Sequence, residues 1–240
     1  EDEILKEFER IYNKYHDSSR YSMLQIALSP CSPFSVTKEL LIESATFARK
    51  RGIKLHTHLA ETIDEEDYCI KEYGMRPLDF MESVGWLGKD VWYAHGIHFK
   101  DDELKKLGRT CTGVAHCPTS NMRLMSGVAK IREMIDLGVP VVLAVDGSAS
   151  NDSSNFMREV KMALYLSRTR MNISPLTHLD VLWLATRGGA QLLGRDDLGS
   201  IEKDKAADII LYKNNRIDFA GDVHDPVASL IYCGTSDRVD

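Results

Sequence analysis

The segment KLHTHLAET (residues 54–62) guides the interpretation of the whole chain, because it is a predicted strand that ends in ligand-type side chains. It holds two histidines one residue apart, His56 and His58, and a glutamate, Glu61. A His-x-His pair at a strand end is a common start for a metal site. A His-x-x-Glu pair can instead join a metal ligand to a proton carrier. The segment alone leaves both interpretations open.

Strand and helix patterns alternate on both sides of this segment. Short apolar runs predict five strands, over residues 21–30, 53–61, 90–99, 110–118 and 139–147. Amphipathic helices are predicted between them, over 35–52, 64–74, 76–88, 101–108 and 127–138. This alternation implies an α/β fold with a parallel sheet and helices on its faces. Either a doubly wound sheet or part of a (β/α)8 barrel satisfies it.

The two ends of the chain carry different patterns. Apolar residues at helical spacing predict a helix before residue 16. After Asn151, two longer helical patterns cover residues 156–170 and 178–194, and β-segments are predicted over 206–213 and 227–234. No repeat or low-complexity tract competes with this interpretation.

Composition narrows the class of protein. Hydrophobic residues make up 43% of the 240 residues, so a substantial core can form. The net charge of −6 argues against nucleic acid or an anionic membrane as the main partner. Five irregularly spaced cysteines fit a reducing compartment. We see no signal peptide and no apolar run long enough to span a bilayer, so we expect a cytoplasmic soluble protein.

Every predicted strand after the first ends in a residue that can bind a metal or move a proton. These residues are His56, His58 and Glu61, then His95 and His98, then His116, then Asp146. The C-terminal ends of parallel strands converge on one face, where active sites lie. A single histidine at such a place is more often structural, but coincidence explains four successive strands poorly.

The residue types are chemically coherent. Neutral imidazole and carboxylate are the usual ligands of zinc or ferrous iron. A catalytic site keeps one position open for water, whose pKa the metal lowers. Glu61 lies three residues beyond His58 and could pass the proton of that water to a leaving group.

Several longer segments resemble the metal-dependent amidohydrolase superfamily, and within it the aminohydrolases that deaminate purine-like rings. The matching segments are HTHLAET, YAHGIH, VAHCPTSNMRLMSG, VDGSASND and LATRGGAQLLGRDDLGSIEKDKAADIIL. They run in the family's order over most of the chain. CPTSNMRLMSG, DGSASND and VHDPVASLIYCG look closest to 8-oxoguanine deaminases and their guanine- and triazine-hydrolase relatives.

The resemblance implies a (β/α)8 TIM barrel of amidohydrolase type. Counting back from Asp146 as strand eight makes residues 54–62 strand five, so the chain holds strands four to eight. The first-strand His-x-His pair is then absent from this chain. Residues 1–205 would form a partial barrel, and residues 206–240 would lead into a small β-sandwich.

The resemblance also assigns roles to single residues. His58 and Asp146 would be ligands of one divalent metal per chain, zinc in the first place with iron as the alternative. Glu61, His95 and Asp146 would be catalytic: Glu61 as proton carrier, His95 orienting the water, and Asp146 able to take its proton. His116 would contact the substrate, with a hydrogen bond that braces its loop as the alternative. That leaves His56 as a structural neighbour.

The implied reaction is hydrolytic deamination of a purine-like heterocycle, with 8-oxoguanine giving urate and ammonia as the leading expectation. Guanine, isoxanthopterin, a triazine or an adenosyl nucleoside are alternative substrates. A non-catalytic scaffold that kept the barrel and lost the metal is the alternative from another class. The expected partner is a small heterocyclic molecule. The oligomeric state stays open, with a homo-oligomer as one option.

Overall fold

The computed structural model describes residues 2–215, 217–220 and 224–239. The chain divides into two compact units. The first comprises residues 1–115 and 137–140, and the second comprises residues 116–136 and 141–240. No helix within the described ranges is long and apolar enough to cross a membrane.

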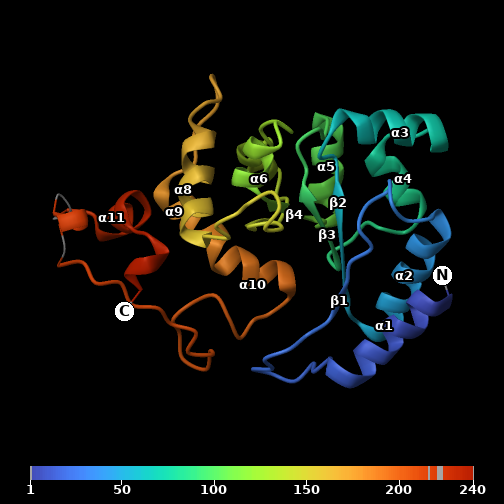
Figure 1. The fold of residues 1–240 in the computed structure, drawn as a ribbon, viewed down its shortest axis with the longest axis horizontal. Helices are drawn as coiled ribbons and strands as arrows, with labels where there is room; N and C mark the ends of the chain where they lie inside the picture. The colour runs from blue at the N-terminus through green and yellow to red at the C-terminus, as the bar shows by residue number, and fades with distance from the viewer. Residues whose placement is uncertain (1, 216, 221–223, 240) are drawn as a thin grey trace. The chain divides into compact units, whose positions relative to one another are not determined.

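The first unit is an alternation of strands and helices (Figure 1). Its strands are β1 (Ala27–Leu28), β2 (Lys54–Leu59), β3 (Val91–His95) and β4 (Gly113–His116), whose last residue begins the second unit. Its helices are α1 (Asp2–Tyr15), α2 (Lys38–Arg51), α3 (Ile63–Tyr73), α4 (Pro77–Ser83) and α5 (Asp101–Thr110). Figure 1 shows α2, α3 and α4 on the same side of β2 and β3.

The second unit is mainly helical. It contains β5 (Val141–Leu143), α6 (Pro118–Arg123), α7 (Ile131–Asp136), α8 (Phe156–Ser167), α9 (His178–Ala185), α10 (Arg187–Leu193) and α11 (Pro226–Cys233). Two short 3₁₀ turns, η1 (Ile217–Phe219) and η2 (Ser236–Arg238), flank α11. The predicted helices of residues 127–138 and 156–170 are therefore confirmed in shorter form.

The strands pair in parallel and in chain order, β1-β2-β3-β4-β5. The register aligns His58 with Ala94 and Leu59 with His95, so the ends of β2 and β3 lie at the same level. A doubly wound sheet reverses its strand order at a switch point, whereas a barrel does not. Of the two α/β options left open by the sequence, this order favours the barrel.

Capping residues fix the helices that the sequence predicted in the first unit. Thr37 caps α2 by accepting a hydrogen bond from the Leu40 amide at 3.2 Å, and Thr62 caps α3 in the same way through the Glu65 amide. Gly52 ends α2 with φ of 68°, a left-handed conformation that glycine adopts without steric cost.

The core of the first unit lies between the strands and their covering helices. Leu41, Leu55, Leu59, Trp86 and Tyr93 are all fully buried. The Trp86 indole donates a 2.8 Å hydrogen bond to the Leu41 carbonyl, so the one polar atom of this side chain is paired. Burying these large side chains supplies the main stabilising free energy of the unit.

Three local predictions were wrong. Residues 227–234 are not β but lie mostly in helix α11, because Asp225 accepts from the amides of Val227 and Ala228 and Pro226 opens the first turn. Residues 206–213 form no strand and contribute only one isolated bridge, from Tyr212 to Val239. The single helix predicted over 178–194 is two helices, separated at Thr186 with φ of −129° and ψ of −86°.

Candidate functional site

His58 lies on the less buried face of β2. Burial alternates along this strand, with Leu55, Thr57 and Leu59 buried and the residues between them partly exposed. Because side chains alternate across a strand, His56 and His58 share one face. The sequence-based placement of both histidines on one face is confirmed.

A backbone carbonyl selects the tautomer of His58. The His58 Nδ1 atom lies 2.6 Å from the Cys31 carbonyl oxygen, which also accepts from the His58 amide and the Thr57 hydroxyl. A carbonyl oxygen only accepts hydrogen bonds, so Nδ1 must carry the proton. The Nε2 lone pair is then the one that can bind a metal, and the loop after β1 holds the ring in place.

Glu61 and His95 meet beside His58. The Glu61 Oε2 atom lies 3.5 Å from His95 Nε2, and the rings of His58 and His95 stack with centroids 5.4 Å apart. The His95 side chain is buried, whereas 22% of the Glu61 side chain is exposed. A partly exposed carboxylate beside a buried imidazole can hold a proton and pass it on. Three of the predicted site residues are therefore together in the first unit.

The backbone at these strand ends adopts an uncommon conformation. Ala60 has φ of 54° and His95 has φ of 72°, both in the left-handed region. Gly96 follows with φ of 61°, and a side chain there would crowd Phe99 and Val114. Left-handed backbone in non-glycine residues clusters at functional sites, where the surrounding structure maintains it.

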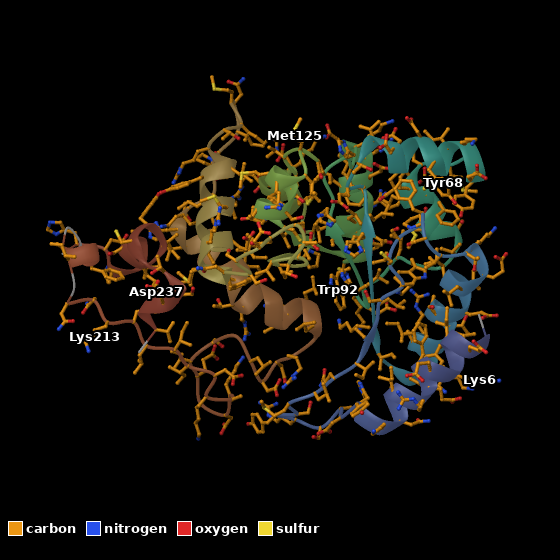
Figure 2. The ribbon with its side chains drawn as sticks, in the orientation of Figure 1. Lys6, Tyr68, Trp92, Met125, Lys213 and Asp237 are labelled. Atoms are coloured by element: carbon orange, nitrogen blue, oxygen red, sulfur yellow. The ribbon has the colours of Figure 1, made fainter. Side chains whose placement is uncertain are left out.

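His56 has a structural environment. Its ring stacks on Trp92 of β3 with centroids 5.0 Å apart and an interplanar angle of 13°. Its Nδ1 atom lies 3.4 Å from the Trp92 carbonyl oxygen. Figure 2 labels Trp92 on this strand. These contacts support the role of structural neighbour expected for His56.

The sequence interpretation missed Glu65. Its side chain is on the first turn of α3, is 2% exposed, and accepts a 2.6 Å hydrogen bond from the Ala60 amide through Oε1. Burial raises the pKa of Glu65 to about 7, against the lowering effect of the Ala60 and Glu61 amides. A glutamate at the third position of a capped helix is ordinarily part of the cap, so no local pattern marked it.

Asp146 belongs to the second unit, where serines hold its carboxylate. Its Oδ2 atom accepts hydrogen bonds from the Ser120 hydroxyl at 2.5 Å and the Ser150 hydroxyl at 2.7 Å. The residue has φ of 64°, again left-handed. Two hydroxyl donors hold one oxygen of the carboxylate in place, and carboxylate oxygens are common metal ligands.

A buried network supports the loop that carries Asp146. The Asn151 amide group donates to the Val145 carbonyl at 2.8 Å and to Glu159 Oε1 at 2.9 Å. The other carboxylate oxygen of Glu159 accepts from the Thr119 amide at 3.0 Å. Within this unit, the network joins the loop after β5 to helices α6 and α8.

His116 ends β4 and is 2% exposed. It lines a small cavity of ≈20 Å³ together with apolar residues of the same unit, among them Ala129, Ile131 and Leu176. This environment tests neither a substrate contact nor a loop brace, so both predictions for His116 stay open.

One protein family matches almost the whole chain. The profile of the amidohydrolase family matches residues 3–232. The chain belongs to the amidohydrolase family. The family membership predicted from the sequence resemblance is therefore confirmed.

Curated relatives are deaminases and aminohydrolases of heterocycles. An 8-oxoguanine deaminase from Pseudomonas aeruginosa is 48% identical over 99% of this chain and 52% of its own length. A hydroxydechloroatrazine ethylaminohydrolase from Pseudomonas sp. (strain ADP) is 38% identical over 100% of this chain and 50% of its own length. The chain spans about half the length of the curated relatives it matches.

Solved amidohydrolases have the same fold. A triazine hydrolase variant superposes with a TM-score of 0.95 at 34% identity, over 100% of this chain and 53% of the other. The atrazine chlorohydrolase from Arthrobacter aurescens TC1, solved in complex with zinc, has a TM-score of 0.95 at 33% identity over the same shares. The α/β amidohydrolase fold is therefore established for the chain.

Proposed function

We propose that the full-length protein hydrolytically deaminates a purine-like heterocycle, with 8-oxoguanine as the leading substrate. The contact between Glu61 Oε2 and His95 Nε2, beside a histidine with a defined tautomer, is the observation that carries this proposal. The 48% identity to an 8-oxoguanine deaminase supports the choice of ring. In the balanced reaction, water adds to the amino-bearing carbon and ammonia leaves, so the amino group is replaced by an oxo group.

We propose that the protein binds one divalent metal ion, zinc in the first place with iron as the alternative. His58 and Asp146 would hold it, and His95 belongs to the same candidate group by residue type. The donor chemistry fits, because Nε2 of His58 keeps its lone pair and two hydroxyl groups orient the Asp146 carboxylate. When bound, such an ion supplies Lewis acidity and lowers the pKa of a water molecule toward ~7.

The side chains of the chain itself have separate tasks in this proposal. Glu61, once it has taken up a proton, delivers that proton to a ring nitrogen and helps ammonia leave. His95 donates a hydrogen bond that orients the attacking water. The Asp146 carboxylate accepts the proton of that water, while its serine partners keep the carboxylate in one orientation. His116 would contact the substrate.

We also propose that β1 to β5 are strands four to eight of a (β/α)8 barrel. The chain order of the parallel strands and the superposition on triazine hydrolase support this assignment. Residues 1–205 would then belong to the barrel, and residues 206–240 would lead toward a β-sandwich.

Ammonia release from a panel of amino-heterocycles tests the reaction. The panel holds 8-oxoguanine, guanine, isoxanthopterin, an aminotriazine and an adenosyl nucleoside, each incubated with full-length protein. Glu61→Gln should lower kcat by about 10²–10⁴-fold because it removes the proton carrier. Glu72→Gln, an exposed change on α3, is the matched control and should keep kcat.

Metal analysis of the same samples separates an enzyme from a scaffold. We expect about one equivalent of metal per chain in the wild type and in Glu61→Gln. A wild type that binds no metal and releases no ammonia from any member of the panel would support the scaffold. Full activity in Glu61→Gln would show that Glu61 is not the proton carrier.

A further inference from the structure

We propose that Glu65 is a positioning residue, whose buried carboxylate fixes the backbone of Ala60 and Glu61 and so directs the Glu61 side chain toward His95. The inference rests on the proposed function, because it concerns the proton carrier of that reaction. The contacts of the segment between β2 and α3 support this role.

Glu65 bonds backward along the chain, past the cap of its own helix. In the usual capping box, a glutamate at the third helical position accepts from the amide of the cap residue. The cap residue of α3 is Thr62, yet Glu65 Oε1 accepts from the Ala60 amide at 2.6 Å, and the Glu61 amide is a second donor. The carboxylate therefore holds the two residues directly before the cap.

Helix α5 provides an internal comparison, because Glu103 occupies the same position there. Glu103 accepts from the amide of its own cap residue, Lys100, at 2.7 Å and forms a two-point ion pair with Arg76. That ion pair compensates for the burial of Glu103. The described contacts of Glu65 are backbone amides, and its burial raises its pKa to about 7. A buried carboxylate with this environment costs stability, which suggests a role other than holding the helix.

The peptide that Glu65 holds also joins the ends of two strands. Ala60 has left-handed backbone, with φ of 54°. Its carbonyl accepts from the amides of Ile97 and His98, at 2.8 and 2.9 Å, in the turn that follows His95. Glu61 Oε2 lies 3.5 Å from His95 Nε2. Movement of the Ala60 peptide would therefore change the position of Glu61 relative to His95.

The test uses Glu65→Ala and Glu65→Gln in the full-length protein. Glu65→Ala removes both acceptor oxygens, so kcat should fall about tenfold or more while KM stays within about twofold, because a small displacement of a catalytic group affects chemistry more than binding. Glu65→Gln keeps one acceptor oxygen and should lie between Glu65→Ala and the wild type. Metal content should be unchanged in both variants.

Glu66→Ala and Glu66→Gln are matched controls from the same helix turn. Glu66 pairs with Arg76 and makes no described contact with the Ala60–Glu61 peptide. Both control variants should keep kcat. The control pair separates loss of backbone positioning from a general loss of negative charge on α3.

Hydrogen exchange gives a readout that is independent of activity. The amides of Ala60 and Glu61 should exchange faster in Glu65→Ala than in Glu66→Ala, while the amides of β3 stay protected. Equal exchange and equal kcat in the two variants would overturn the proposal, as would faster exchange across the whole unit. If the wild type releases no ammonia at all, the proposed function fails, yet local exchange still tests whether Glu65 holds this peptide.

Discussion

At the residue scale, three carboxylates have very different surroundings. Glu61 is partly exposed beside His95, Glu65 is buried among backbone amides, and Asp146 is held by hydroxyl groups. We therefore propose separate roles for the same functional group, which carries a proton at Glu61, holds a peptide at Glu65 and binds a metal at Asp146. The sequence predicted the first and third of these residues from their places at strand ends. It missed Glu65, because the burial of this side chain and its contact with the Ala60 amide appear only in the folded structure.

The pH dependence of stability should reveal Glu65. Its pKa is raised from 4.5 to about 7 in the folded state, so between these pH values the folded protein keeps a proton that the unfolded chain has lost. The free energy of unfolding should therefore be highest below pH 4.5 and fall by roughly 3 kcal/mol as the pH rises through 7. Urea unfolding at pH 5 and pH 8 should show a smaller loss in Glu65→Gln than in the wild type. Equal losses would contradict the assigned pKa.

At the element scale, each strand after β1 ends in, or is closely followed by, at least one side chain of a type that can bind a metal or move a proton. The caps of α2 and α3 were predictable, because Thr37, Gly52 and Gly74 are local signals. Helix α11 was mispredicted, because its apolar residues fit a strand as well as a buried helix. The break at Thr186 has no glycine or proline signal at that position, so two short helices looked like one long helix.

Two helical glycines should respond oppositely to alanine. In α5, a side chain at Gly108 would overlap the Leu137 carbonyl, so Gly108→Ala should lower the free energy of unfolding by roughly 1–3 kcal/mol. In α10, Gly189 has open space around the position of a Cβ atom, so Gly189→Ala should raise it by roughly 0.5–1 kcal/mol. Denaturant unfolding measures both. A stabilised Gly108→Ala variant would show that α5 can move away from Leu137.

At the scale of the whole molecule, the order of the parallel strands is the feature that supports the proposed barrel. All five strands follow one another without reversal, and the chain superposes over its full length on triazine hydrolase. The alternation of elements predicted the α/β class and left two topologies open. Strand order favours the barrel, and the sequence could not supply it, because pairing partners are set by contacts between segments distant in sequence.

Removal of metal should lower the thermal stability of the full-length protein, because an ion that binds only the folded state stabilises it. At a free metal concentration of about 1,000 times Kd the stabilisation is ~4 kcal/mol. Chelation should therefore lower Tm, and zinc should restore it. Asp146→Asn should show a much smaller change in Tm on chelation. Asp152→Asn, an exposed change paired with Arg123, should behave as the wild type. An unchanged Tm after chelation would contradict the metal proposal.

The sequence by itself determined the alternation of strands and helices and the residues at the strand ends, because both follow from short-range periodicity in the chain. It thereby led to the proposal of His58, Glu61, His95 and Asp146 as site residues. Only the tertiary structure decided which atom of each group is engaged. The Cys31 carbonyl, 27 residues before His58, fixes the tautomer of the His58 ring. The buried Glu65 carboxylate accepts from the Ala60 amide, whereas its position in the helix is typical of a capping residue. Hydrogen-bond partners and burial arise when distant segments meet, so no local pattern in the chain encodes them.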